Sequence, residues 1–226
     1  MSQDRDKALP GACYSKVKKL LRLDGNASLT IFPTHCLAGR HGGREVQRTT
    51  LLVVRTGTRD LLARRGIDCL TVTGAGTGSF EFEAASGVFT ESQCGSYIFM
   101  DADYGRNRDR AGSPFTTFEP SLYVWATVMS RPTEDRAIVD DGLKALPFDS
   151  GCLLSGDAPA ATYERASDEH GKLGISGATN RLHIGDKIRL IPGHCDPTVN
   201  LYDWYVCVRN NRVEQLWPIT ARGAVY

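Results

Sequence analysis

The stretch Ile67-Asp-Cys-Leu-Thr-Val-Thr-Gly-Ala-Gly-Thr-Gly-Ser79 joins a β-rich run directly to a glycine-rich turn. The first part, Ile67–Thr73, has the β-branched and apolar content of a short buried strand. Before it, Thr58–Arg65 has the pattern of the end of a helix, and Gly66 supplies the usual stop. A helix, a strand and a glycine-rich turn in that order predict part of an α/β unit.

The glycine-rich turn Gly74–Ser79 has the composition of an anion-binding loop. Glycines let the backbone approach a ligand closely, and successive N–H groups can surround a phosphate. Thr77 and Ser79 add hydroxyl donors. The turn lacks the Gly-Lys-Ser/Thr ending of a P-loop and the GxGxxG spacing of a dinucleotide fold, which favours a smaller phosphate-bearing ligand. A plain tight turn is the alternative explanation of the same residues.

Most of the chain beyond this unit is rich in residues that favour β-strands. Asn210-Asn211 tolerates positive φ and predicts a two-residue hairpin. The strands that we expect are Ser96–Met100, Leu122–Met129, Thr162–Ser167, Asp186–Ile191, Tyr205–Arg209 and Arg212–Trp217. We expect the three tryptophans, Trp125, Trp204 and Trp217, to pack in a core. These observations predict an antiparallel β-domain.

The sequence therefore suggests three segments. Residues 1–48 form an atypical leader to which we assign no role. Residues 49–110 form the α/β part with the glycine-rich turn, and residues 111–226 form the C-terminal β-domain.

Composition narrows the classes of protein that the chain can represent. Of its 226 residues, 41% are hydrophobic and 23% are charged, as in ordinary globular proteins. The formal net charge is +1, so no strong field favours a nucleic acid or a membrane surface. Seven scattered cysteines without a CxxC pair predict reduced thiols. With no apolar signal core near Met1, we expect a cytoplasmic protein with no nucleic-acid or membrane partner.

The segment Pro192-Gly-His-Cys-Asp-Pro-Thr198 follows a predicted strand and could bind a metal. In an extended chain His194 and Asp196 point to the same side, with Cys195 opposite. Nitrogen and oxygen ligands suit Mn²⁺ or Mg²⁺, and Zn²⁺ less specifically, whereas His194 with Cys195 would favour zinc. A loop in which Asp196 makes an Asx turn and His194 is merely packed explains the same residues.

Taken together, several segments resemble the D-threonine aldolase and D-serine dehydratase family of pyridoxal-phosphate enzymes. The matching pieces, in the family's order, are Gly74–Ser79, Gln93–Asp101, Ser167–Gly171, Gly185-Asp186, Pro192–Asn200 and Leu216–Ile219. The resemblance implies an alanine-racemase-like (β/α)8 barrel that holds the cofactor, a C-terminal antiparallel β-domain and, in the intact family, a homodimer. Here only residues 49–110 resemble the barrel, so the predicted fold is an α/β remnant of it followed by the β-domain.

The resemblance also assigns roles to residues of both predicted sites. It places the phosphate of pyridoxal 5'-phosphate at Gly76, Thr77, Gly78, Gly95 and Ser96. A divalent metal is expected at His194 and Asp196, with Mn²⁺ or Mg²⁺ favoured over Zn²⁺. The family's dehydratase branch has a cysteine in place of this aspartate, so Asp196 favours the aldolase branch.

The resemblance further implies a lyase that cleaves D-β-hydroxy amino acids of the D-threonine or 3-hydroxy-D-aspartate type to glycine and an aldehyde. The Schiff-base lysine of the family is expected in a Pro-His-x-Lys-like strand end, and no such motif occurs here. We therefore name no catalytic residue and expect a truncated or frame-disrupted barrel with little activity alone. A D-serine dehydratase-like deaminase and a non-catalytic fragment or binding module are the alternatives.

Overall fold

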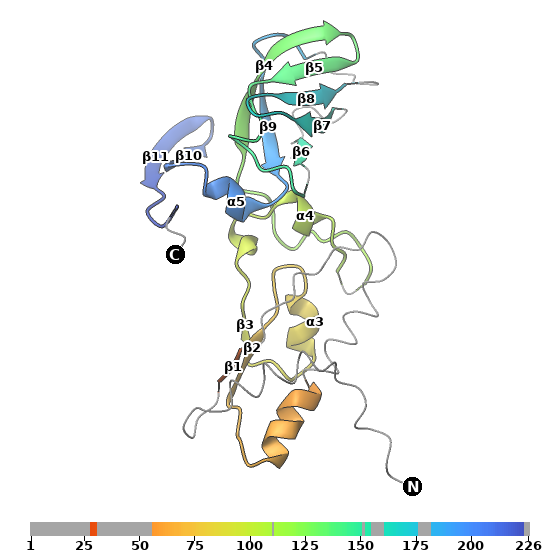
Figure 1. Cartoon of the computed structure of the whole chain (residues 1–226), viewed down its shortest axis with the longest axis vertical. Helices are drawn as coiled ribbons and strands as arrows, with labels where there is room; N and C mark the ends of the chain where they lie inside the picture. The colour runs from red at the N-terminus through yellow and green to blue at the C-terminus, as the bar shows by residue number, and fades with distance from the viewer. Residues whose placement is uncertain are drawn as a thin grey trace. The chain divides into compact units, whose positions relative to one another are not determined.

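The computed structural model describes residues 28–30, 56–109, 111–150, 152–154, 161–175 and 182–223. They belong to two compact units that divide between Gly95 and Ser96 (Figure 1). This division falls earlier in the chain than the one we expected at residue 110. It separates Gly95 from Ser96, two neighbours that the resemblance assigns to one phosphate. No helix among the described residues is long and apolar enough to cross a membrane.

The first unit contains a small parallel sheet in the order β1-β2-β3. Its strands are β1 (Ser28–Thr30), β2 (Thr71–Gly74) and β3 (Glu91–Ser92). Parallel neighbours need a crossover connection, and α3 (Phe80–Ala85) lies in the connection between β2 and β3. β1 comes from the segment that we left unassigned, and its backbone pairs with β2 from Ser28↔Thr71 to Thr30↔Thr73.

The helix and the strand before the glycine-rich turn are of the predicted type, but their lengths differ from the prediction. Residues 56–64 are helical, and Gly66 has a φ of 72°, as expected of a helix stop. The strand begins at Thr71, not at Ile67. Leu70 is largely exposed, whereas Val72 is buried. The α/β order that the sequence predicted is confirmed.

The second unit is built on a six-stranded antiparallel sheet in the order β6-β9-β4-β5-β8-β7. Its strands are β4 (Val124–Thr133), β5 (Arg136–Val139), β6 (Cys152–Leu154), β7 (Thr162–Ala166), β8 (Gly171–Gly174) and β9 (Lys187–Pro192). Figure 1 shows the sheet in green to blue. The predicted antiparallel β-domain is confirmed.

The core of this sheet follows from the alternation of β4 and β9. Val124, Ala126 and Val128 are buried, and the residues between them are more exposed. The pairing register places Val124 opposite Leu190 and Ala126 opposite Ile188. Because strand side chains alternate between faces, these four apolar residues share one face and form the centre of the core.

The strand predicted at Ser96–Met100 is wrong. The structure has a 3₁₀ turn there, η1 (Ser96–Ile98), and both Phe99 N and Met100 N donate to the Ser96 carbonyl. Ser96 and Met100 are buried while Tyr97 and Ile98 are exposed. That spacing of buried residues is helical, and a run of five apolar and small residues does not distinguish it from a strand. The short helix α4 (Ala102–Gly105) follows directly.

The C-terminal hairpin is confirmed. β10 (Trp204–Arg209) pairs with β11 (Arg212–Pro218), and Asn210 and Asn211 have φ values of 50° and 58°. The expected burial of the tryptophans is wrong, because Trp125 is 66% exposed and Trp204 and Trp217 are each 56% exposed. Trp125 lies on the outer face of β4, and every residue of β11 is exposed.

Asp141 is a buried carboxyl group whose two oxygens have no hydrogen-bond partner within the described ranges. The backbone around it is fixed: the Tyr163 hydroxyl donates to the Asp141 carbonyl at 2.7 Å. A Cβ at the next residue, Gly142, would lie 2.4 Å from the Ser167 carbonyl oxygen. Burial, and then the charge of Asp140, raise the pKa of Asp141 to about 7.

We predict that Asp141→Asn flattens the dependence of stability on pH. The native pKa of about 7 lies above the unfolded value of about 3.9. The protonated carboxyl therefore stabilises the fold fully below about pH 4, and this contribution is lost as the pH rises through about 7. One pKa unit corresponds to about 1.4 kcal/mol, so the loss amounts to a few kcal/mol.

Urea denaturation of both proteins across this pH range measures the effect. Asp168→Asn removes an exposed carboxylate in the neighbouring turn and should behave like the unaltered chain. A parallel loss of stability in Asp141→Asn and the unaltered chain would show that Asp141 is not the group responsible.

Candidate functional site

The glycine-rich turn runs from the end of β2 into α3. Ala75 has a positive φ of 67° and is buried, so the chain turns sharply after Gly74. The amides of Ser79 and Phe80 both donate to the Gly76 carbonyl at 3.0 Å. The Ser79 hydroxyl accepts from the Gly76 amide at 3.3 Å. The turn is therefore held by its own hydrogen bonds.

Thr77 sits at the middle of this turn with a hydroxyl group that is fully buried. Its Oγ1 has no hydrogen-bond partner in the part of the chain that the structure describes. A buried hydroxyl without a partner destabilises a fold by about 1–3 kcal/mol. A phosphate oxygen would accept from it and remove this penalty. The turn thus fits the phosphate group that the resemblance implies.

Gly95 belongs to the same unit and lies shortly after β3, the strand that pairs with β2. The Gln93 amide donates to the Gly74 carbonyl at 2.7 Å, so the segment leading to Gly95 runs beside the start of the glycine-rich turn. A Cβ built at Gly95 would meet no atom within 4 Å. The structure therefore brings the Gln93–Gly95 segment to the same sheet edge as Gly76, Thr77 and Gly78, because parallel strands end on one side.

Ser96 lies in the second unit, where it opens η1. It is buried, and its side chain hydrogen-bonds with those of Tyr104 and Cys195. Ser96, which the resemblance assigns to the cofactor phosphate, therefore hydrogen-bonds to Cys195, the residue between His194 and Asp196.

His194 and Asp196 converge, although not in the extended conformation that we expected. His194 is extended, with φ −143° and ψ 120°, and it stands directly before the helix α5 (Cys195–Val199), which contains Asp196. The atoms His194 Nε2 and Asp196 Oδ2 lie 3.6 Å apart. A cation about 2.1 Å from each atom fits between donors separated by up to about 4.2 Å. The spacing of the two donor atoms therefore fits one divalent cation.

Asp149 is a member of this cluster that the sequence did not indicate. Its Oδ2 lies 3.4 Å from Nδ1 of His194. A carboxylate on one ring nitrogen favours the tautomer that leaves the other nitrogen free to bind a metal. Asp149 follows Phe148 in an irregular loop, with no motif or periodicity around it. Its proximity to His194 arises only in the folded chain.

The alternative pairing of His194 with Cys195 is disfavoured. Cys195 is buried, and burial above all raises the pKa of its thiol to about 12. The charges of Asp196 and Asp101 act in the same direction, while a hydrogen bond with Ser96 opposes them. Metal binding requires the thiolate. Within the described ranges, no three His, Cys, Asp or Glu side chains are arranged as a metal site. A metal here would therefore have two protein ligands and positions open to water or substrate.

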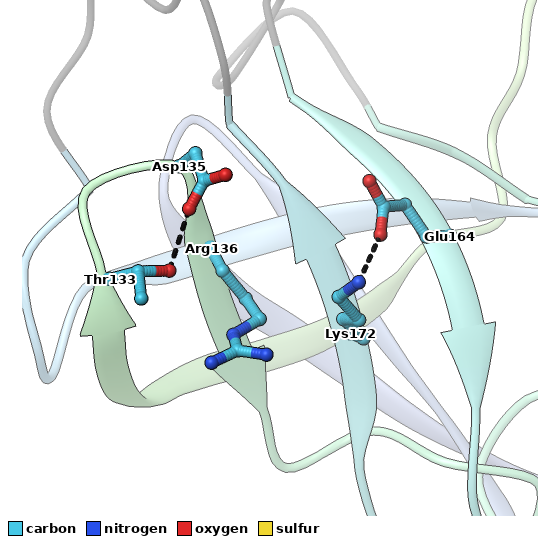
Figure 2. Close-up of a pocket in the computed structure, with 5 residues that line it drawn as sticks. All are labelled: Thr133, Asp135, Arg136, Glu164 and Lys172. Carbon is cyan, nitrogen blue, oxygen red and sulfur yellow. Dashed lines mark hydrogen bonds and ion pairs between the residues drawn. The ribbon is translucent and has the colours of Figure 1, made fainter.

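A polar pocket elsewhere on the β-domain is poorly suited to binding an ionic ligand (Figure 2). It is lined by Thr133, Asp135, Arg136, Glu164 and Lys172. Lys172 forms an ion pair with Glu164 at 2.7 Å, and the Thr133 hydroxyl donates to Asp135 at 2.6 Å. Two acidic and two basic side chains balance, so the pocket offers no net charge to an ionic ligand.

Comparison with known proteins gives a consistent set of relatives. The family model described as "Putative serine dehydratase domain" matches residues 121–208. A 3-hydroxy-D-aspartate aldolase of Paracoccus denitrificans (strain Pd 1222) is 46% identical over 169 residues, which are 74% of this chain and 43% of the relative. The chain spans less than half the length of that curated relative.

Solved structures also match this chain. The crystal structure of D-threonine aldolase from Filomicrobium marinum matches with a TM-score of 0.73 and 45% identity, over 81% of this chain and 50% of that one. An alanine-racemase-like protein from Idiomarina loihiensis matches with a TM-score of 0.58 at 18% identity, over 85% and 55% of the two chains. The predicted fold, part of an alanine-racemase-like barrel followed by an antiparallel β-domain, is confirmed.

We predict that Thr77→Val stabilises the ligand-free chain and weakens its response to phosphate. The substitution keeps the shape of the side chain and removes a buried hydroxyl without a partner. The free energy of unfolding should therefore rise by about 1 kcal/mol. The same change removes a donor to a bound phosphate. Thermal unfolding with and without inorganic phosphate measures both effects.

Thr73→Val is the matched control, because Thr73 is also buried but its hydroxyl donates to Glu91 at 3.2 Å. That variant should lose stability. If Thr77→Val is destabilised and still stabilised by phosphate as much as the unaltered chain, the assignment of Thr77 to a phosphate is wrong.

Proposed function

We propose that this chain, which belongs to the family of D-threonine aldolases, 3-hydroxy-D-aspartate aldolases and D-serine dehydratase-like enzymes, carries the phosphate turn and the metal-binding pair of a pyridoxal-phosphate aldolase. Its substrates would be D-β-hydroxy amino acids. The observation that carries the proposal is the convergence of His194 Nε2 and Asp196 Oδ2 at 3.6 Å. These are a nitrogen and an oxygen donor, with Asp149 on the other ring nitrogen of His194.

The glycine-rich turn would hold the phosphate of pyridoxal 5'-phosphate. Pyridoxal phosphate, when bound, accepts the electrons released by cleavage of the substrate's Cα–Cβ bond. Thr77 would donate its buried hydroxyl to a phosphate oxygen, and the glycines on either side allow the backbone to lie close to it. Gly95 would add a contact from the segment that follows β3.

His194 and Asp196 would hold a divalent cation, Mn²⁺ or Mg²⁺, next to the β-hydroxyl group of the substrate. A bound cation supplies Lewis acidity, which lowers the pKa of a hydroxyl group. The side chain of His194 is 30% exposed and that of Asp196 is 75% exposed. The pair would therefore be open to a substrate on its outer side, and Asp149 would help to orient the imidazole.

The lysines that the structure describes are unsuited to forming the bond with the cofactor aldehyde, which requires an unprotonated amine. Lys144 and Lys172 form ion pairs with Glu169 and Glu164 on the surface of the β-domain. The hydrogen bond and charge of Glu169 raise the pKa of Lys144. Lys187 donates to the Thr127 hydroxyl. We infer that the chain by itself has little or no aldolase activity.

We predict that the chain binds Mn²⁺ and that His194→Ala and Asp196→Ala each abolish this binding. Asp149→Asn should weaken binding on the order of tenfold, because removing an outer partner of a metal ligand typically lowers affinity about 10–100-fold. Electron paramagnetic resonance of free Mn²⁺ during a titration measures the affinity. His170→Ala, an exposed turn histidine, is the control and should bind like the unaltered chain. Equal affinity in His194→Ala would rule out this metal site.

We also predict that borohydride treatment with stoichiometric pyridoxal phosphate labels no single lysine of this chain in preference to the others. With Mn²⁺ added, no glycine should form from D-threonine or 3-hydroxy-D-aspartate. Peptide mapping and amino-acid analysis measure the two quantities. Substantial turnover would contradict the inference that the chain is inactive alone. Release of pyruvate from D-serine would instead support a dehydratase.

A further inference from the structure

The carboxylate of Asp101 joins two elements that are far apart in the sequence. The side chain is 1% exposed. Its Oδ1 accepts from the Tyr104 amide at 2.9 Å, which caps the start of α4. Its Oδ2 accepts from the amide of Cys195 at 3.2 Å. One buried carboxylate thus holds α4 and the first residue of α5.

The contacts of α4 fix the backbone on both sides of His194. The Asp103 amide donates to the carbonyl of Gly193 at 3.1 Å, one residue before His194. The bond from Cys195 N to Asp101 lies one residue after it. Cys195 also lies between the two proposed metal donors, so these two bonds hold the backbone on either side of His194 and next to Asp196.

The burial of Asp101 is unfavourable unless its charge is hydrogen-bonded, since buried carboxylates without partners are strongly destabilising. Two backbone amides satisfy it, and both of its oxygens are engaged in this way. A hydrogen bond that links a charged acceptor to a fixed amide is also stronger and more directional than a neutral one. These properties suit a group that holds a loop in one conformation.

We propose that Asp101 is a positioning residue for the metal-binding pair. It holds the Cys195 amide so that His194 Nε2 and Asp196 Oδ2 converge on one cation, although Asp101 itself is not a ligand. This inference rests on the proposed metal site, and it adds to that site a residue outside the His194–Asp196 pair. Metal affinity should therefore depend on Asp101.

Asp101→Asn is the direct test, because the amide that replaces one oxygen leaves either Tyr104 N or Cys195 N without its acceptor. We expect the affinity for Mn²⁺ to fall on the order of tenfold. Asp103→Asn is the matched control: it makes the same change on the same helical turn, but the Asp103 side chain is exposed and faces Arg106. Its affinity should remain within about twofold of the unaltered chain.

A second variant tests the same bond if Asp101→Asn does not fold. Cys195→Pro removes the donor at the first residue of α5, where proline is favoured, and His194 already has the extended backbone that precedes a proline. It should lower the affinity for Mn²⁺ as well. Because Cys195→Pro also removes the thiol and its contacts with Ser96 and Asp196, Cys195→Ala, which keeps the amide, is its control and should bind Mn²⁺ more tightly than Cys195→Pro.

The measurements separate this inference from the proposed function. If His194→Ala abolishes Mn²⁺ binding while folded Asp101→Asn or Cys195→Pro binds as tightly as the unaltered chain, the positioning role is wrong and the metal site stands. A role in stability alone would lower the melting temperature and leave the affinity of the folded protein unchanged, which also overturns the inference. Failure of the unaltered chain to bind Mn²⁺ through His194 would overturn both.

Discussion

The backbone pairing of β9 with β4 determines both the core of the β-domain and the place where the candidate metal site begins. Its register puts Val124 opposite Leu190 and Ala126 opposite Ile188. A slip of one residue would turn every inward side chain of β9 to the outer face, so the apolar core specifies the register strongly. β9 ends at Pro192, and His194 follows after a single glycine. The hydrophobic core thereby fixes the starting point of the loop that carries His194 and Asp196.

The two candidate sites differ in how the fold supports them. The glycine-rich turn is held by its own backbone hydrogen bonds, and the buried Thr77 hydroxyl has no hydrogen-bond partner among the described residues. The loop with His194 and Asp196 is contacted by groups outside it, namely the buried Asp101 and the more exposed Asp149. A ligand would satisfy an orphaned donor in the first site. In the second, these contacts would prearrange two partly exposed donors for a cation with open coordination positions.

Much of this could be predicted from the sequence where the signal is local. The alternation of β4, the Asn210-Asn211 hairpin and the glycine stop at Gly66 each follow from one rule of backbone or side-chain geometry. A short apolar run fits both a strand and a 3₁₀ turn, so the sequence does not identify the 3₁₀ turn at Ser96–Ile98. The contacts of Asp101 and Asp149 could not be predicted, since their partners lie 94 and 45 residues away, respectively. Long-range contacts of single polar residues leave no periodic trace in the sequence.

The central claim is that His194 and Asp196 bind a divalent metal in a pyridoxal-phosphate aldolase site. Pulsed electron paramagnetic resonance of the chain loaded with Mn²⁺ tests it most directly, because the spectrum reports nitrogen atoms bonded to the ion. The proposed site predicts coupling to the nitrogen of one imidazole, and this coupling should disappear in His194→Ala. A spectrum of bound Mn²⁺ without nitrogen coupling, or one that His194→Ala leaves unchanged, would contradict the claim.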